Sequence, residues 1–475
     1  MELDTTYENL DATALAEKVR AGEVSPRELV EEAIKRCERT NGTLNAVITE
    51  MFEHARAAAE HVPLTGPFAG VPFLMKDFGA EVAGTRFTEG SAFLSAYIPD
   101  EDSELYRRFC EAGLITFGKT NLPEFAMGTT TEPQLFGPSR NPWDPDRTTG
   151  GSSGGAGAAV AARVVPMAHG NDVGGSIRIP ASCCGLVGLK PSRGRVTLAP
   201  HYGDVLGGAF QELALTRSVR DTAALLDAVT ASTPGEPYVA APPPRPYAEE
   251  VLRDPAPMRI GFSTTTPLGD PVDDECLDAV IATATLCKSL GHDVEEATPD
   301  FNAERLWTQY TTMLAALMAW AIADWARRTG QAASEDRFEP FVWAFSDRGR
   351  NLDAAEYLMA VQDVQREVRQ LSRFYETRDV WLTPTLGQPP VPLGTLRYEG
   401  DPFALRRRMA RFSPYTYIAN ASGQPAISLP LHWSGEGLPI GLHFTARLGE
   451  ESRLLALAAQ LERAAPWGDK KPAIG

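Results

Sequence analysis

The sequence predicts an α/β fold in which a mixed or largely parallel sheet lies between helices. Short apolar strand segments at residues 71–75 and 114–117 are separated by an amphipathic helical segment at 103–112. Strands that alternate with helices are typical of such sheets. The chain has 475 residues, of which 43% are apolar, so it can bury a large core.

Helical signals precede the first predicted strand. Asp11 is placed to cap one helical segment, and Ser25 with Glu28 forms a capping box that has a proline at the first helical position. This box predicts a helix that extends to about Arg39. Another helical pattern covers residues 50–60 and leads toward the strands.

A run of prolines at residues 242–246 marks the predicted boundary in the middle of the chain. Beyond it, strand and helix patterns return, and the helical periodicity is strongest between about 303 and 375. Two apolar strands around a Ser-Gly-Glu-Gly turn at 434–437 predict a hairpin. In chain order we expect a strand at 258–262, a helix at 274–290, helices over 303–375, a strand at 380–382, hairpin strands at 426–432 and 439–445, and a helix at 451–464.

The charge and hydropathy patterns exclude two kinds of partner. A net charge of −17 argues against nucleic acid, because nucleic-acid binders neutralise phosphates with clustered basic residues. The densest basic run, at residues 406–408, is interpreted as a solvated helix face. The longest apolar run, at 313–323, is shorter than the roughly 20 residues of a membrane-spanning helix. The N-terminus shows no signal-peptide pattern, so we expect a cytoplasmic location and no membrane partner.

The cysteines and histidines indicate no metal site. The six cysteines form no Cys-x-x-Cys pair, and the seven histidines lack the spacing of metal ligands. So few cysteines in a chain of this length favour reduced thiols over a disulfide framework. We therefore expect no disulfide, no metal and no cofactor.

The most unusual composition lies at residues 150–157, which read Gly-Gly-Ser-Ser-Gly-Gly-Ala-Gly. A phosphate-binding loop would need a lysine after these glycines, and none follows. A dinucleotide-binding fingerprint fails because Val160 stands where the last glycine is required. A flexible linker would be followed by polar sequence, whereas residues 158–165 have a helix and strand pattern. A plain loop stays open as the alternative to a functional one.

A second motif, at residues 172–178, places two glycines before a predicted helix. Gly174 and Gly175 let the backbone turn and expose consecutive N–H groups at a helix N-terminus, which stabilises negative charge. Ser176 would present its hydroxyl at the same place, as in a nucleophile elbow. The motif is not Gly-x-Ser-x-Gly, however, and no histidine has a spacing that marks it as the base. Another group must accept the proton.

Lys76 is the candidate base. It ends the apolar strand at 71–75, where a lysine is unusual because exposed lysines prefer loops and helix faces. Burial and neighbouring donors can lower a lysine pKa by several units and leave a neutral amine. The alternative is a structural salt bridge between Lys76 and Asp77, and this segment alone leaves both interpretations open.

Four motifs together resemble the amidase signature family in their order, spacing and glycines. The likeness covers residues 20–230 and resumes over 420–462. The motifs are Gly-Val-Pro-Phe-Leu-Met-Lys-Asp at 70–77, Gly-Gly-Ser-Ser-Gly-Gly at 150–155, Asp-Val-Gly-Gly-Ser-Ile-Arg at 172–178 and Cys-Gly-Leu-Val-Gly-Leu-Lys-Pro at 184–191.

The resemblance implies the domain organisation. One α/β/α domain would span residues 1–475 around a mixed, mostly parallel central sheet. Its core motifs would lie at 65–230 and 378–465. A helical region at about 300–375 would cover the pocket.

The resemblance also implies catalytic roles. Lys76 would be the base, Ser152 the bridging serine in a cis peptide bond, and Ser176 the nucleophile that is acylated. Thr149 and Cys183 depart from the family pattern, but neither is one of these three residues. The oxyanion hole would consist of the N–H groups of Val173, Gly174, Gly175 and Ser176, with Asp172, Arg178 and Ser153 as supporting residues.

The activity implied is hydrolysis of carboxylic amides through an acyl-enzyme, so that amide and water give carboxylate and amine. The alternative is the catalytic subunit of a tRNA-dependent amidotransferase, which shares the three catalytic residues and passes ammonia to a partner. The chain has no basic tRNA-facing region, which favours the stand-alone enzyme. An inactive interaction module is disfavoured because all three catalytic residues are present. A homodimer stays open.

The expected substrate is a small-molecule amide. An apolar pocket favours aryl, medium-chain acyl or ω-amino-acid amides, and esters and carbamates (urethanes) present the same carbonyl geometry. Segments at 131–133, 140–143 and 169–172 are similar to the family branch that hydrolyses cyclic nylon oligomers. For residues 310–325, simple core packing is the alternative to a role in the pocket. The candidate substrate contacts are Met127, Gly128, Thr129, Leu314 and Met318.

Overall fold

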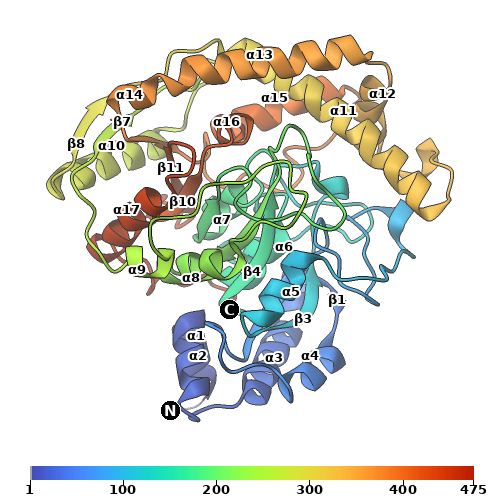
Figure 1. Cartoon of the computed structure of the whole chain (residues 1–475), viewed down its shortest axis with the longest axis vertical. Coiled ribbons are helices and arrows are strands. Elements are labelled where there is room, and N and C mark those ends of the chain that lie inside the picture. The colour runs from blue at the N-terminus through green and yellow to red at the C-terminus, as the bar shows by residue number, and fades with distance from the viewer. Residues whose placement is uncertain (1–2) are drawn as a thin grey trace.

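A computed structural model describes residues 3–475 of the protein (Figure 1). Eleven strands form one sheet in the order β1-β3-β2-β4-β6-β5-β10-β11-β9-β7-β8. Helices surround this sheet, so the chain is a single α/β domain, as the sequence predicted. The strands are β1 (Val47–Glu50), β2 (Val71–Lys76), β3 (Leu114–Thr120), β4 (Met167–Asp172), β5 (Val187–Lys190), β6 (Gln211–Thr216), β7 (Arg259–Phe262), β8 (Asp293–Glu296), β9 (Val380–Pro384), β10 (Ala426–Trp433) and β11 (Pro439–Ala446).

The helices cover both faces of the sheet and its ends (Figure 1). Three short 3₁₀ turns, at Ala92–Leu94, Glu124–Ala126 and Glu335–Arg337, complete the elements. The α-helices are α1 (Leu3–Asn9), α2 (Ala12–Arg20), α3 (Pro26–Leu44), α4 (Phe52–Ala59), α5 (Glu104–Glu111), α6 (Gly154–Ala161), α7 (Arg178–Cys184), α8 (Val219–Val229), α9 (Tyr247–Glu250), α10 (Asp274–Ser289), α11 (Ala303–Thr329), α12 (Pro340–Arg350), α13 (Ala354–Ser372), α14 (Phe374–Thr377), α15 (Pro402–Phe412), α16 (Thr416–Ser422) and α17 (Glu451–Ala464).

The sheet is mixed, but the expectation that it is mostly parallel was wrong. Four of the ten strand pairings are parallel, β2 with β3 and β4, and β7 with β8 and β9. The other six are antiparallel. Some of the antiparallel pairings arise because the connection between the two strands contains no crossover helix. The turn between β10 and β11 is too short to return the chain for parallel pairing.

Local sequence signals account for several elements. Ser25 and Glu28 form the predicted capping box at the start of α3, and the hairpin of β10 and β11 is confirmed. The segment at 150–157 is partly helical rather than only a loop, because α6 already begins at Gly154. A Cβ on Gly155 would lie 2.5 Å from the carbonyl oxygen of Ala46. Glycine therefore lets α6 pack directly against the neighbouring chain.

The parallel pairing of β2 and β4 positions the candidate site. Leu74 of β2 lies opposite Ala168 of β4, so the two strands end at the same edge of the sheet. Lys76 is the last residue of β2, and Asp172 is the last residue of β4. The Gly-rich loop before α6 and the Gly174–Gly175 turn before α7 follow at this edge. Ligands of open α/β sheets commonly bind there.

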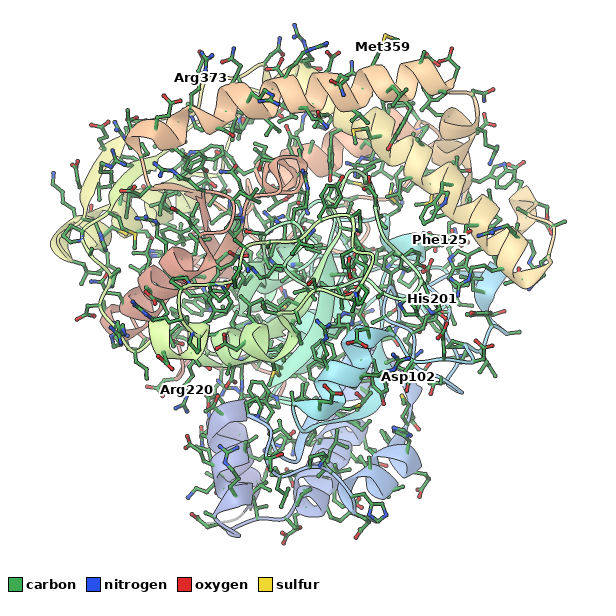
Figure 2. All side chains as sticks on the ribbon, in the orientation of Figure 1. Asp102, Phe125, His201, Arg220, Met359 and Arg373 are labelled. Carbon is green, nitrogen blue, oxygen red and sulfur yellow. The ribbon has the colours of Figure 1, made fainter. Side chains whose placement is uncertain are left out.

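The helices α12 and α13 each pack against α11, and the three helices extend along one side of the molecule (Figure 1). In Figure 2 Met359 points outward from α13, whereas Phe125 lies inside the molecule near α11. None of the helices within residues 3–475 combines the length and the apolar character needed to cross a membrane.

Candidate active site

Lys76 is completely buried at the end of β2. Its Nζ atom lies 2.8 Å from Ser152 Oγ and 2.6 Å from Asn171 Oδ1. Burial lowers the pKa of Lys76 from 10.5 to about 7, although the negative charges of Glu212, Asp172 and Glu89 oppose this shift. Near neutral pH a substantial fraction of Lys76 is therefore the neutral amine.

The alternative salt bridge from Lys76 to Asp77 is not formed. Asp77 pairs with Lys119 at 3.4 Å, and its Oδ2 accepts hydrogen bonds from the amide and hydroxyl of Thr88 at 2.9 and 2.6 Å. The side-chain partners of Lys76 are therefore Ser152 and Asn171 and not Asp77.

A buried histidine anchors the backbone of Lys76. The amide of Lys76 donates to His169 Nδ1 at 3.2 Å. His169 Nε2 lies 2.6 Å from Glu212 Oε2, and both side chains are buried. Because Nδ1 accepts, Nε2 carries the proton and donates it to Glu212. This pair fixes the end of β2 from which Lys76 projects.

Ser152 follows a cis peptide bond with Gly151, as the resemblance implied. The next amide, of Ser153, donates to the carbonyl oxygen of Ser176 at 3.2 Å and so joins the two glycine motifs. Ser153 is the N-cap residue of α6, but its hydroxyl makes no cap. It instead donates to the carbonyl oxygen of Asn171 at 3.4 Å.

Of the four N–H groups predicted for the oxyanion hole, the structure excludes one, that of Gly175. The Gly175 N–H donates to Asp172 Oδ1 at 2.8 Å, so this amide is not available to an oxyanion. Across residues 3–475, the amides of Val173, Gly174 and Ser176 meet no acceptor. These three N–H groups can therefore stabilise negative charge at this turn.

Two hydroxyl groups orient the peptide units of this turn. The Tyr310 hydroxyl donates to the carbonyl oxygen of Val173, and Thr416 Oγ1 donates to that of Gly174 at 2.5 Å. In a trans peptide the N–H points away from the preceding carbonyl. Tyr310 thus sets the direction of the Gly174 N–H, and Thr416 directs the Gly175 N–H toward Asp172.

Asp172 and Arg178 form a buried two-point ion pair at the start of α7. Arg178 Nε and Nη2 lie 3.0 and 2.9 Å from the two carboxylate oxygens. Burial tends to raise the pKa of Asp172, but the Arg178 charge outweighs it and holds this pKa well below the usual range. The carbonyl oxygen of Thr416, Asn420 Oδ1 and His443 Nε2 are further partners of the guanidinium, at 2.8, 2.7 and 2.9 Å. The pair supports the turn, as predicted for both residues.

The two predicted serines and all predicted substrate contacts line one cavity. Ser152 and Ser176 line it, and α11 supplies lining residues from Trp307 to Trp325. The predicted contacts Met127, Gly128, Thr129, Leu314 and Met318 all line the same cavity. Most other lining side chains are apolar or aromatic, among them Phe78, Phe125, Ile179, Val205, Phe210, Leu317, Trp320 and Met409.

Sequence reasoning missed several polar groups of the site. Asn171 lies within a segment compared with the nylon-oligomer branch, but its contact with Lys76 depends on how β2 and β4 pair. Tyr310 belongs to a helix that was considered only for its apolar residues. Thr416 and Asn420 had no signal, because short polar residues in a helix are common.

The comparisons with known proteins identify the family. The family model described as Amidase matches residues 28–455. The chain belongs to the amidase family. It is therefore a hydrolase of amide bonds, as the sequence predicted.

Individual relatives match almost the whole chain. A 6-aminohexanoate-cyclic-dimer hydrolase from Pseudomonas sp. (strain NK87) is 40% identical, over 98% of this chain and 96% of the relative. A solved structure of a 6-aminohexanoate cyclic dimer hydrolase complexed with substrate has a TM-score of 0.94 at 39% identity, and the match covers 98% and 99% of the two chains. A bacterial aryl acylamidase structure has a TM-score of 0.87 at 26% identity, with 97% of each chain covered.

Proposed function

We propose that the chain is a stand-alone amidase for small-molecule amides in which Ser176 is the nucleophile, Ser152 the relay and Lys76 the base. The observation that carries this proposal is the 2.8 Å contact between Lys76 Nζ and Ser152 Oγ. Lys76 is buried and its pKa is lowered to about 7. Ser152 and Ser176 line one cavity, so that a substrate bound there can present its carbonyl to Ser176.

The proposed reaction begins with neutral Lys76. It accepts the hydroxyl proton of Ser152 while Ser152 accepts that of Ser176, and Ser176 Oγ bonds to the carbonyl carbon of the amide. The N–H groups of Val173, Gly174 and Ser176 stabilise the oxyanion that forms. As the intermediate collapses, the C–N bond breaks. The proton returns from Lys76 through Ser152 to the leaving nitrogen, so that a neutral amine departs.

Hydrolysis of the acyl-enzyme reverses these proton movements. Water gives one proton to Ser152, which passes its own hydroxyl proton to Lys76, as the water oxygen bonds to the acyl carbon. The bond to Ser176 Oγ then breaks, and Ser176 regains a proton from Ser152. The product leaves as a carboxylic acid, which loses its proton to the solvent to give the carboxylate, and the three side chains return to their starting state.

Asn171 acts in this scheme as a positioning residue for Lys76. Its Nδ2 donates to the carbonyl oxygen of Phe78 at 3.0 Å, so its Oδ1 is the atom that faces Lys76. A neutral amine has two N–H groups and one lone pair. If one N–H donates to Asn171, the lone pair can point toward the Ser152 hydroxyl. The base is then oriented before substrate binds.

The apolar lining of the cavity supports amides with aryl, medium-chain acyl or ω-amino-acid groups. The relative that hydrolyses a 6-aminohexanoate cyclic dimer supports nylon-type oligomers as a further class. Esters and carbamates share the attacked carbonyl geometry and belong to the same proposal.

A single protein preparation can test the proposal. Purified wild-type chain, with no other protein present, is expected to hydrolyse a neutral anilide, a 6-aminohexanoate oligomer, a carbamate or an ester. Intact-mass measurement during turnover of an activated ester should show one acyl group per chain. If the pure chain hydrolyses none of these substrates but does so with an added partner, the amidotransferase alternative replaces the proposal.

A further inference from the structure

We propose that the part of the cavity beside the first turns of α11 is a subsite for a carboxylate group of the substrate. Arg406, Trp307, Thr311 and Tyr417 would bind that carboxylate. The inference rests on the proposed function and narrows its substrate class to amides that carry a carboxylate within reach of the scissile bond.

Arg406 differs from the two arginines beside it on α15. Arg407 pairs with Asp270 at 2.9 Å, and Arg408 pairs with Glu399 at 2.5 Å. Arg406 instead lines the cavity, which corrects the interpretation of residues 406–408 as one solvated face. Within residues 3–475, no carboxylate lies within ion-pair distance of Arg406, and its buried Nε atom has no partner.

Three further polar groups of the same cavity wall lack partners. They are Trp307 Nε1, Thr311 Oγ1 and Tyr417 Oη, all buried and without a hydrogen bond to any group of residues 3–475. Trp307 and Thr311 are four residues apart on α11 and therefore share a face. The ring of Tyr417 lies 5.9 Å from that of Tyr310, which is on the turn between them.

The chemistry of these groups selects an acceptor. The guanidinium and the indole N–H can only donate hydrogen bonds, and the two hydroxyls can donate as well. A carboxylate offers two acceptor oxygens and the negative charge that a guanidinium binds most strongly. A neutral alkyl chain would leave all four groups unsatisfied, which is costly for buried polar atoms.

The charge at this subsite is not neutralised from elsewhere in the cavity. Burial lowers the pKa of Arg406 to about 10, so the guanidinium stays protonated at neutral pH. The carboxylates that line the cavity, Glu89 and Asp324, lie toward the other end of α11, near Trp325. From Tyr310 to Trp325 the helix rises about 22 Å at 1.5 Å per residue. An unpaired cation therefore faces the substrate at one end.

The subsite adjoins the reacting groups. Tyr310 and Arg406 line the same cavity, and the Tyr310 hydroxyl donates to the carbonyl oxygen of Val173. Val173 belongs to the turn that offers N–H groups to the oxyanion. A carboxylate held by Arg406 would thus sit close to the scissile carbonyl, on its acyl side or on its amine side.

Two matched substrate pairs test the inference. Glutaric acid mono-4-nitroanilide and pentanoic acid 4-nitroanilide differ by a carboxylate on the acyl side. N-butyryl-4-aminobenzoate and butyranilide differ by a carboxylate on the amine side. For each pair, the ratio of kcat/KM for the charged to the neutral substrate is measured in wild type, Arg406→Met and the control Arg408→Met.

In wild type we expect one pair to favour the charged substrate. Arg406→Met should lower that ratio roughly 10- to 100-fold, as for loss of a hydrogen bond to a charged group. Tyr417→Phe and Trp307→Phe, which preserve ring packing, should lower it roughly 2- to 10-fold. Arg408→Met should keep the wild-type ratio. The pair that responds tells which side of the amide carries the carboxylate.

Equal ratios in wild type and Arg406→Met for both pairs would overturn the inference. This outcome is distinct from failure of the proposed function, in which wild type turns over neither member of a pair and forms no acyl group on Ser176. If Arg406→Met does not fold, Tyr417→Phe still decides the matter. An unchanged ratio in that variant counts against the subsite.

Discussion

The catalytic end of the cavity and its wall on α11 and α15 differ in how their buried polar atoms are satisfied. At the catalytic end, Lys76, Asp172 and Arg178 have protein partners at 2.6 to 3.0 Å. On the wall, Trp307 and Arg406 have buried nitrogen atoms without a partner among residues 3–475. The comparison teaches that Lys76 and the Asp172–Arg178 pair are positioned before any substrate binds, whereas the wall keeps polar atoms that are available to a substrate.

The largest expected effect is the loss of the nucleophile at the preorganised end. Ser176→Ala should lower kcat roughly 10⁶-fold, because removing one residue of a cooperating catalytic set costs about as much as removing the whole set. Thermal unfolding should change little, because the side chain faces the cavity. The measurement is intact mass during turnover of an activated ester. A stoichiometric acyl group on the variant would contradict the assignment.

Lys76 tests whether the preorganised end works through a neutral amine. Because the pKa is lowered to about 7, Lys76 is protonated below this pH and neutral above it. We therefore expect kcat/KM to rise with pH through about 7 to an alkaline plateau. Lys76→Arg should be nearly as inactive as Lys76→Ala, since a guanidinium keeps its proton. Substantial activity of Lys76→Arg would mean that Lys76 is a structural cation and not the base.

The relay serine should show an intermediate effect. Ser152→Ala should lower the rate roughly 10²- to 10⁴-fold, in the range of general acid–base catalysis. An anilide should suffer more than its matching nitrophenyl ester, because the amine must gain a proton to leave and a nitrophenolate need not. Both variants, Ser152→Ala and Ser153→Ala, are measured on both substrates.

Ser153→Ala serves as the neighbouring control. Its hydroxyl makes one long hydrogen bond, to Asn171, so the expected cost is about 1 kcal/mol of stability with little loss of rate. If this control slows the anilide reaction more than Ser152→Ala does, the two serines have been assigned in the wrong order.

The contact between Asn171 and Lys76, which orients the proposed base, can be tested by substitution of Asn171. Asn171→Asp places a negative charge 2.6 Å from the position of Lys76 Nζ, which should raise the pKa of the lysine. The acid limb of the pH profile should move roughly 1 to 3 units higher. A merely structural Asn171 would reduce activity alike at every pH, without such a movement.

The smallest expected effect is that of metal removal. Incubation with EDTA followed by desalting should leave kcat/KM unchanged, because the proposed steps use only the serines, Lys76 and backbone amides. In residues 3–475 no group of three or more His, Cys, Asp or Glu side chains is placed to hold a metal ion. Activity lost to EDTA and restored by a divalent ion would break the mechanism.

Several helices and strands and the candidate catalytic residues could be predicted from short stretches of sequence. Apolar runs and caps specify β2, α3 and the hairpin of β10 and β11 locally, so they could be predicted from neighbouring residues. The positions of Lys76 and Ser176 were marked by unusual residues at the end of a strand and after paired glycines. Such signals are short in sequence and need no knowledge of distant contacts.

Which polar groups contact one another depends on packing between distant parts of the chain, so it could not be predicted from the sequence. The contact of Lys76 with Asn171 joins residues 95 positions apart, and that of Tyr310 with Val173 joins residues 137 apart. The same holds for the Gly175 amide, which donates to Asp172 because Thr416 orients its peptide unit.

Arg406 is the clearest example of a residue whose surroundings could not be predicted from the sequence. Within the run at 406–408, Arg407 and Arg408 pair with acidic residues, whereas Arg406 has no acidic partner among residues 3–475 and lines the cavity. The direction in which each points was set by the packing of α15 against the cavity, and no local pattern encodes that packing. Sequence fixes the chemistry that each residue carries, and long-range packing fixes which groups that chemistry can reach.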